Sequence, residues 1–366
     1  MKKVLFIIPS LRGGGAEKLL SDILNRYDSS KYEVHLMYFY KNNVYIGDIP
    51  RYVKQIVPFY IDDSSLTRLG WLLLKILRLR DRVFKYKIRK AVDNYYDTIV
   101  SFLEGQSLHF HNFLVDRANK NISYVHTDFR NYPISLNNDS LNEYNNMDCI
   151  VFVSENACES FRQVFPTNYS DHKVLPNFID IEKIKLKAND FQMSYRIPTI
   201  ICVGRLEEVK GFEILIDIAK QLENAIAEFQ FRIIGAGVEE NKLKRLVKVN
   251  NIEDKIIFDG FKRNPYPYIA NSDILLSTSL AEGFSLVICE AMSLGIPVVS
   301  SKTDGALSLL GSGAGILVER NANEYASAIL QLLQNREMYN QYVLLGKNQA
   351  KMHDINQYMC QLYDIL

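Results

Sequence analysis

The sequence predicts an α/β protein built from two Rossmann-like halves. Short apolar runs alternate with helical patterns along most of the 366 residues, which is typical of parallel sheets covered by helices. The alternation is interrupted by a polar, lysine-rich stretch that ends near Tyr195, and it restarts at Pro198. A chain of this length also suits two cores better than one. We therefore expect a first domain at residues 1–178, a linker at 179–195 and a second domain at 196–345.

The first half opens with a strand, a glycine loop and a helix. The apolar run from Val4 to Ile8 ends at Pro9, three glycines follow at 13–15, and AEKLLSDILNRY has a helical apolar stripe. Such a loop lets backbone amides approach an anion or a sugar. A dinucleotide fingerprint would need a glycine three positions after Gly15, where Lys18 stands. A phosphate or sugar loop and a purely structural turn both remain open.

Further strands are expected at 33–40, 97–102, 122–127 and 149–154. His126 lies near the carboxyl end of the third of these runs, where open α/β sheets bind their ligands. A packed structural histidine and a functional one are equally good interpretations of His126. His109 and His111 have no acidic or thiol companions in the sequence, so we interpret both as structural.

Between Leu66 and Val92 the chain is basic and apolar. It carries one acid, Asp81, against nine cations: Arg68, Lys75, Arg78, Arg80, Arg82, Lys85, Lys87, Arg89 and Lys90. Trp71 and a run of leucines lie among them. This pattern is typical of a helix that lies on anionic lipid. An ordinary domain helix with a solvated basic face is the alternative.

The second half repeats the strand–helix alternation. Its strands are expected at 198–203, 229–235, 255–260, 273–278, 297–301 and 315–318. Arg205 follows the first of them, and Lys210 comes five residues later in GRLEEVKG. A guanidinium and an ammonium at such a turn can hold a diphosphate from two directions.

The stretch AEGFSLVICEAMSLG, residues 281–295, is the strongest site signal. Glu282 precedes Gly283, and Glu290 lies in a segment that reads as a helix beginning near Ser285. Free N–H groups at the start of that helix suit a phosphate. Two solvated glutamates on an amphipathic helix are the alternative. When a sugar–phosphate bond is cleaved, negative charge grows on the departing phosphate. Free N–H groups at a helix start can stabilise that charge.

These motifs together resemble the retaining nucleotide-sugar glycosyltransferases of family four, which have the GT-B fold. The resemblance rests on GGGAE at 13–17, GRLEEVKG at 204–211 and EGFSLVICEAMSLGIPVV at 282–299. It implies two Rossmann-like domains facing across a cleft, the first binding the acceptor and the second the nucleotide sugar. It also implies that residues 346–366 return to the first domain.

The resemblance assigns roles to individual residues. It implies that Arg205 and Lys210 hold the donor diphosphate, that Glu290 binds the ribose hydroxyls and that Glu282 lies near the donor sugar. The remaining donor-binding positions that it implies are Gly14, Gly15, Gly283, Phe284, Ser285 and Leu286. The catalytic candidates are His126, Glu282, Arg205 and Lys210, with His126 contacting the sugar.

Two departures from the family limit what the resemblance implies. The segment after PVVSS, TDGALSLLGSGAGILV, lacks the glutamate that the family usually has before the last strand. The loop after Asp259-Gly260-Phe261 reads the nucleobase mostly through its backbone in this family. The side chains therefore do not define the nucleobase. A UDP-sugar is the favoured expectation and a GDP-sugar the alternative, and the sugar itself is open.

The expected activity is transfer of a sugar, with retention, to a hydroxyl of a glycan or lipid-linked acceptor. The expected setting is bacterial-type surface polysaccharide assembly, as in capsule, exopolysaccharide or O-antigen. No cofactor or metal is expected, since no DxD-type acidic pair stands at a strand end. Two alternatives stay open, a non-catalytic GT-B partner subunit and a nucleotide-sugar epimerase.

Composition points to the cytoplasm. The five cysteines are scattered without a CxxC, which favours reduced thiols. The first apolar run ends after five residues, so we interpret it as a strand and not as a signal peptide. No run reaches 18 apolar residues, and a net charge of +1 gives no case for nucleic acid. Peripheral contact with the inner membrane face is expected through Trp71, Arg78, Arg80 and Arg82.

Overall fold

The computed structural model describes residues 1–366 except 13, 42, 62–79, 128, 130–137 and 169. The chain separates into two compact units. Unit 1 is Met1–Pro176 together with Asn356–Leu366, and unit 2 is Asn177–Ile355. The stretch expected as a linker, 179–195, contains helix α7 (Ile181–Ala188) and falls in unit 2.

Unit 1 contains a seven-stranded parallel sheet with the order β3-β2-β1-β4-β5-β6-β7. Its strands are β1 (Lys2–Ile7), β2 (Tyr32–Met37), β3 (Lys54–Ile56), β4 (Tyr96–Ser101), β5 (Ala118–Val125), β6 (Cys149–Phe152) and β7 (Asp171–Val174). Runs such as VLFI in β1 are buried throughout, because helices cover both faces of a parallel sheet. Strand β3 is short and has only one buried residue, Ile56, so its sequence carries little apolar signal.

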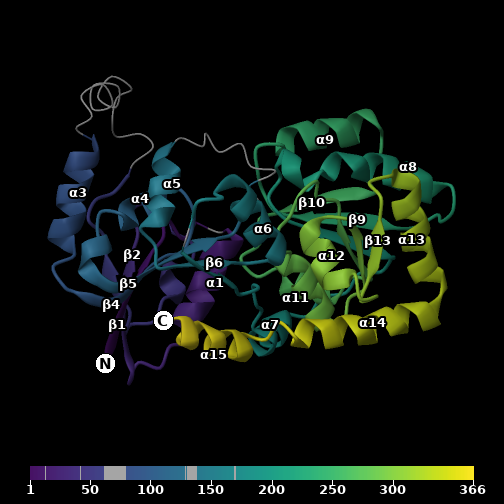
Figure 1. The fold of residues 1–366 in the computed structure, drawn as a ribbon. Coiled ribbons are helices and arrows are strands. Elements are labelled where there is room, and N and C mark those ends of the chain that lie inside the picture. Colours follow the sequence, from purple (N-terminus) through teal and green to yellow (C-terminus); the bar gives the residue numbers. More distant parts are fainter. Residues whose placement is uncertain (13, 42, 62–79, 128, 130–137, 169) are drawn as a thin grey trace. The chain divides into compact units, whose positions relative to one another are not determined.

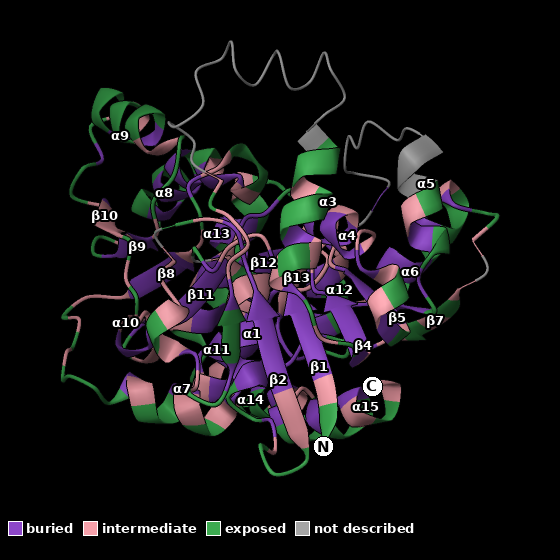
Figure 2. Cartoon of the chain, turned by 90° about the vertical axis from the view of Figure 1, so that its left-hand side faces the viewer, coloured by how far each residue is buried: buried purple, intermediate pink, exposed green. Residues whose placement is uncertain are grey.

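The helices of unit 1 pack their apolar stripes on this sheet. They are α1 (Gly15–Leu24), α3 (Arg80–Ala91), α4 (Gln106–His111), α5 (Asn138–Asn145), α6 (Glu155–Val164) and α15 (Ile355–Ile365), with the 3₁₀ turns η1 (Ile46–Asp48) and η2 (Val115–Arg117). Ile88 of α3 and Phe110 of α4 join Leu5, Ile7 and Ile99 in one core cluster. The outer side of α3 is exposed (Figure 2).

Unit 2 contains a six-stranded parallel sheet with the order β10-β9-β8-β11-β12-β13. Its strands are β8 (Thr199–Val203), β9 (Gln230–Ile234), β10 (Ile256–Gly260), β11 (Ile274–Ser277), β12 (Val298–Ser301) and β13 (Ile316–Val318). Its helices besides α7 are α8 (Leu215–Glu223), α9 (Glu240–Val249), α10 (Tyr266–Ala270), α11 (Leu286–Leu294), α12 (Asp304–Leu310), α13 (Ala322–Gln334) and α14 (Arg336–Lys351), with the 3₁₀ turns η3 (Glu208–Lys210) and η4 (Phe212–Ile214).

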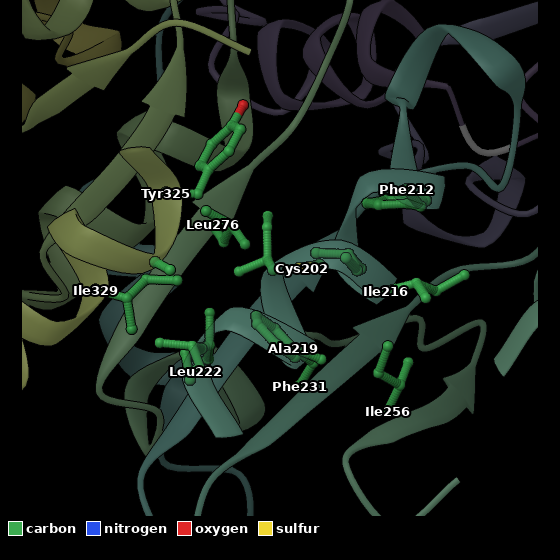
Figure 3. Close-up of a cluster of buried hydrophobic side chains, with 14 of the residues drawn as sticks. Cys202, Phe212, Ile216, Ala219, Leu222, Phe231, Ile256, Leu276, Tyr325 and Ile329 are labelled. Atoms are coloured by element: carbon green, nitrogen blue, oxygen red, sulfur yellow. The ribbon is translucent and has the colours of Figure 1, made fainter. Parts of the chain in front are cut away.

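Two buried clusters cover the two faces of the unit 2 sheet. One joins Cys202 and Phe231 of the sheet to residues of α8 and α13 such as Ala219 and Ile329 (Figure 3). The other joins Ile201 and Leu275 to Ile288 and Met292 of α11, and to residues of α7 and α12. Alternate residues of each strand thus face opposite cores, as the pleat requires.

Both sheets have a point where the order of the strands reverses, and ligands of open α/β sheets bind at such points. In unit 1 the reversal lies between β1 and β4, and in unit 2 it lies between β8 and β11. The loops that follow three of these strands include Gly14, Arg205, Lys210 and Glu282. The topology thus places these predicted residues at the carboxyl edges of the two sheets.

The last helix, α15, packs on unit 1 (Figure 1). The hydroxyls of Tyr358 and Tyr124 are 3.1 Å apart, and Tyr363 stacks on Tyr32 with ring centroids 5.0 Å apart. Thr98 of β4 donates to the backbone carbonyl of Leu366. In the part of the chain that the structure describes, no helix has the length and apolar character needed to cross a membrane.

Candidate functional site: two strand-end clusters

In unit 2, Lys210 and Glu282 come from loops after adjacent strands. Lys210 ends η3 after β8, and its Nζ lies 2.9 Å from Oε1 of Glu282 in the loop after β11. Both side chains are mostly buried, with 22% and 17% of their surface exposed. Arg205, by contrast, is 67% exposed and contacts Glu207 at 2.7 Å. The structure therefore gives Lys210 a fixed position and leaves Arg205 at the surface.

Backbone contacts join the two loops. Thr278 donates its hydroxyl to the carbonyl of Lys210 at 2.8 Å, and the N–H of Leu280 donates to the carbonyl of Val209 at 2.8 Å. Gly211 has φ +63°, and a Cβ there would lie 2.5 Å from the carbonyl oxygen of Thr278. Only glycine combines that backbone conformation with so close an approach. The ammonium of Lys210 is therefore held by its loop as well as by Glu282.

The start of α11 presents unused backbone donors. Ser285 is the N-cap, its side chain makes no capping bond, and the first turn has no acidic residue. Within the described chain, no N–H from Gly283 to Ile288 donates to a backbone or side-chain acceptor. The helix dipole adds a partial positive charge at this end. This arrangement is suited to an anion, and Lys210 contacts the same loop through Glu282.

Gly305, at the start of α12, braces the loop that precedes α11. Its N–H donates to the carbonyl of Glu282 at 2.7 Å. A Cβ at Gly305 would lie 2.9 Å from that carbonyl oxygen and 2.9 Å from backbone atoms of Phe284. Real side chains essentially never approach so closely, so the segment after PVVSS supports the loop through a glycine.

Glu290 lies one helical turn further along α11 and is buried, with 4% exposed. The hydroxyl of Tyr266, which is also buried, donates to its Oε1 at 3.1 Å. Burial raises the pKa of the neighbouring Cys289 thiol well above its ordinary value, and the charge of Glu290 adds to that shift. A carboxylate in such a place needs hydrogen-bond donors, so Glu290 is not the solvated surface residue of the alternative interpretation.

The loop after Asp259 is tied to β9. Arg232 forms a two-pronged ion pair with Asp259 and also packs over the ring of Tyr195, with its guanidinium carbon 5.1 Å from the ring centroid. The N–H of Gly235 donates to the carbonyl of Gly260 at 3.0 Å. These contacts hold the carboxyl ends of β9 and β10 together, beside the loop that follows β8.

In unit 1, the glycine loop leads into α1 with its helix start already satisfied. Gly14 is the N-cap, and its N–H donates to the carboxylate of Glu17 in the first turn. Ser10 donates its hydroxyl to the other carboxylate oxygen at 2.5 Å. Gly14 and Gly15 therefore lie at a helix start that holds a carboxylate of its own, in contrast to α11.

His126 directly follows β5. Its ring lies against the backbone of Phe102, and its Nε2 is buried without a hydrogen-bond partner among the described residues. Burial lowers the pKa of His126, against the opposing effects of Glu104 and the Phe102 carbonyl. The backbone N–H of His126 donates to the carboxylate of Glu104.

The expectation that His109 lacks acidic companions is wrong. Its Nδ1 lies 2.5 Å from Glu143 of α5 and its Nε2 lies 3.6 Å from Asp81 of α3. These acids are 34 and 28 residues away in sequence, so spacing gave no sign of them. Hydrogen bonding to Glu143 raises the pKa of His109. His111 is fully buried between Ser101 and Asn121, and burial lowers its pKa to about 4.

Most of the basic segment lies outside the described residues. Trp71 and Arg78 belong to that part, and Arg80 is described only as the first residue of the α3 backbone. Arg82 is exposed on α3, as are Lys85, Tyr86, Lys87 and Lys90. Arg89 instead forms a two-pronged pair with Asp116. Among the described residues, no group of three or more histidine, cysteine or acidic side chains is arranged to hold a metal.

Sequence reasoning missed three side chains of these clusters: Glu104, Tyr266 and Glu17. Glu104 follows β4 in SFLEG, so its strand-end position was a usable signal. Glu17 fits the capping pattern of an acid three residues after an N-cap. Tyr266 had no local signal, because its contact with Glu290 spans 24 residues.

Comparison with known proteins supplies relatives over the whole chain. The family model described as "Glycosyl transferases group 1" matches residues 189–349. A Campylobacter jejuni protein named N-acetylgalactosamine-N,N'-diacetylbacillosaminyl-diphospho-undecaprenol 4-alpha-N-acetylgalactosaminyltransferase is 30% identical over 97% of this chain and 96% of its own length.

Two solved structures match the chain closely in fold. Sucrose-phosphate synthase from Thermosynechococcus elongatus has a TM-score of 0.78 at 17% identity and covers 100% of this chain and 98% of its own. HepE from Anabaena in complex with UDP-glucose has a TM-score of 0.75 at 20% identity and covers 100% of both chains.

Proposed function

Because the chain belongs to the glycosyl transferases group 1 family and has the GT-B fold, we propose that this glycosyltransferase takes its sugar from a nucleotide diphosphate donor bound to unit 2. The observation that carries the proposal is the start of α11, where unused N–H groups lie between Lys210–Glu282 and Glu290. A UDP-sugar is the favoured donor, since HepE of the same fold was solved with UDP-glucose. A GDP-sugar is the second candidate.

Each group has a proposed role. The N–H groups of Gly283–Leu286 and the ammonium of Lys210 bind the diphosphate, joined by the exposed guanidinium of Arg205. Glu290 accepts from the ribose hydroxyls, and Glu282 accepts from hydroxyls of the donor sugar. The Lys210–Glu282 ion pair supports these roles. A bound diphosphate can take the place of the Glu282 carboxylate at the Lys210 ammonium, and the carboxylate is then available to accept from the donor sugar.

The proposed chemical step retains the configuration of the sugar. The bond between the anomeric carbon and the diphosphate breaks as the acceptor hydroxyl attacks from the same face, and its proton passes to the departing phosphate oxygen. Negative charge grows on that phosphate, and fixed cations and helix-start amides stabilise it. These groups can do so without a metal ion. His126 is proposed to accept a sugar hydroxyl at Nε2, and Gly14 and Gly15 to border the acceptor.

The proposed acceptor is a glycan or lipid-linked glycan of surface polysaccharide assembly. The support is the Campylobacter relative, whose name gives a diphospho-undecaprenol acceptor. Basic side chains on the exposed side of α3, including Arg82, Lys85 and Lys87, suit contact with anionic lipid. Charge reversal of these three residues should abolish sedimentation with anionic vesicles at low salt. Unchanged sedimentation would remove the membrane part of the proposal.

The test of the donor is a panel of UDP- and GDP-sugars, followed for nucleotide release and for new sugar products. The proposal expects hydrolysis or transfer by the wild type and loss of at least about a hundredfold in Lys210→Ala, on the scale of a removed oxyanion donor. Lys220→Ala, a surface lysine on α8, is the matched control. A non-catalytic partner subunit would release no nucleotide with any donor, and an epimerase would convert the donor without an acceptor.

A further inference from the structure

A buried side-chain hydrogen bond joins Tyr266 to Glu290, and nothing in the sequence pattern indicated it. The Tyr266 hydroxyl lies 3.1 Å from Oε1 of Glu290, and the two residues are 5% and 4% exposed. A buried carboxylate is costly unless donors compensate for its lost hydration. A tyrosine hydroxyl supplies such a donor without adding a second charge.

Tyr266 is itself fixed in place. It opens the short helix α10 after Pro265, and its N–H donates to the side-chain oxygen of Asn264 at 3.2 Å. The amide nitrogen of Asn264 donates in turn to the carbonyl of Lys187 at 2.8 Å. The ring of Tyr266 belongs to the buried cluster that also holds Ile288 and Met292 of α11. The hydroxyl therefore reaches Glu290 from a rigid support.

We propose that Tyr266 is a positioning residue that makes nucleotide binding specific for ribose. A carboxylate offers about four acceptor positions, so Glu290 can accept from Tyr266 and still accept from the two ribose hydroxyls. The bond from Tyr266 sets the rotation of the carboxylate and so decides where those acceptor positions point. This inference rests on the proposed binding of the donor nucleotide at α11.

The experiment is a calorimetric titration of UDP and of 2′,3′-dideoxy-UDP into the full chain. The proteins are wild type, Tyr266→Phe, Glu290→Gln and the double variant. Tyr266→Phe removes a single oxygen and keeps the buried ring. The matched control is Tyr268→Phe, which changes the same atom on the same short helix and leaves the ring that contacts Lys262. Guanosine nucleotides replace the pair if the donor screen identifies a GDP-sugar.

We expect the wild type to bind UDP more tightly than the dideoxy nucleotide. Tyr266→Phe should weaken UDP binding about tenfold, the size of one hydrogen bond to a charged group, and leave dideoxy-UDP binding unchanged. In the Glu290→Gln background the same substitution should cost nothing further for UDP. Tyr268→Phe should behave as wild type with both nucleotides.

An equal loss for both nucleotides in Tyr266→Phe would overturn the inference, because it would mean that the hydroxyl only supports the fold. A loss that persists in the Glu290→Gln background would overturn it as well. Equal wild-type affinity for UDP and dideoxy-UDP would instead contradict the ribose role of Glu290. Failure to bind any nucleotide would contradict the proposed donor site itself, so the two levels of failure are distinguishable.

Discussion

The starts of α1 and α11 each follow a strand that borders the point where the strand order reverses, β1 in unit 1 and β11 in unit 2, but their free N–H groups are treated in opposite ways. At α1 the carboxylate of Glu17 accepts from Gly14 and Ser10 and supplies its own negative charge. At α11 the N-cap side chain makes no bond, the first turn has no acid, and Lys210 lies beside the same loop through Glu282. A helix start that contains its own anion has less to offer a ligand than one without.

The two sheet edges also differ in the kinds of side chain that they carry. The basic side chains after β8 are Arg205 and Lys210. The edge of unit 1 instead carries His126 and Glu104, and the wider unit holds His35, His109, His111 and His172. The same sheet topology therefore supports an edge with two basic side chains in unit 2 and an edge with a buried histidine in unit 1.

The largest effect is expected from a carboxylate at the start of α11, such as α1 already has in Glu17. Ser285→Asp places a carboxylate at the N-cap, which favours the helix but repels a diphosphate. Two like charges a few ångströms apart cost on the order of 4 kcal/mol near a protein surface, so nucleotide affinity should fall about a thousandfold. Thermal unfolding should show unchanged or higher stability.

Ser285→Asn is the neutral control and should bind nucleotide within about threefold of wild type, since it caps without a charge. If Ser285→Asp binds the nucleotide as well as Ser285→Asn does, the start of α11 is not an anion site.

Acid should weaken unit 1 through His111. Its pKa is lowered to about 4 in the folded chain, against about 6.5 when unfolded, so the unfolded chain binds more protons between these values. The free energy of unfolding should therefore fall as pH drops from about 6.5 to 4, by up to about 3 kcal/mol from this residue. Urea unfolding at several pH values should show a flatter slope for His111→Asn.

His109 acts in another window. Glu143 raises its pKa, so its contribution to stability is present below about 6.5 and is lost as pH rises through the folded value. A slope between pH 6.5 and 4 that is the same in wild type and His111→Asn would contradict the assignment of acid sensitivity to His111.

Gly305→Ala tests how far the loop before α11 depends on its contact with the start of α12, where the Gly305 N–H donates to the carbonyl of Glu282. The added Cβ would lie 2.9 Å from the carbonyl oxygen of Glu282, so either the loop or α12 must move. Displacement of this size should lower turnover about tenfold and destabilise the chain by about 1–3 kcal/mol. The measurements are donor turnover and thermal unfolding.

Gly47→Ala is the matched control, because a Cβ at Gly47 meets nothing within 4 Å. If both substitutions leave turnover unchanged, the support of the loop by Gly305 is not needed for activity.

The smallest effect is expected at α1. Glu17→Gln removes the charge at that helix start but keeps a side chain of the same size, and it should cost about 1 kcal/mol of stability. Nucleotide affinity should change by less than about twofold, because the proposed nucleotide site is in unit 2. An affinity change as large as that of Ser285→Asp would mean that the two helix starts share one ligand.

Local patterns in the sequence predicted most of the fold and much of the candidate site. Continuous apolar runs indicated the buried strands, because burial on both faces leaves little room for polar residues. The start of the helix at Leu286, next to the Ser285 expected from the sequence, was likewise indicated by neighbouring residues. Strand β3 was not predicted, because it is short, lies at the edge of the sheet and is largely exposed.

The sequence alone could not predict side-chain pairs between elements that are distant in sequence, because only the fold brings them together. The pairings of His109 with Glu143, of Tyr266 with Glu290 and of Arg232 with Asp259 each join separate elements. Helix α7 was not predicted for a different reason, its polar composition. Only Ile184 and Ala188 of its eight residues are buried, so its polar composition resembled that of a linker.

The position of α15 sets the order in which the two units can be completed. Unit 1 needs Tyr358 and Leu362, which are buried in it, yet these residues are made after all of unit 2. A ribosome that synthesises the chain from its amino end therefore finishes unit 2 while unit 1 still lacks its last helix, the reverse of the usual order. Until α15 is synthesised, the ring of Tyr32 lacks its stacking partner, Tyr363. The final eleven residues thus act as the closing step of a unit that was begun first.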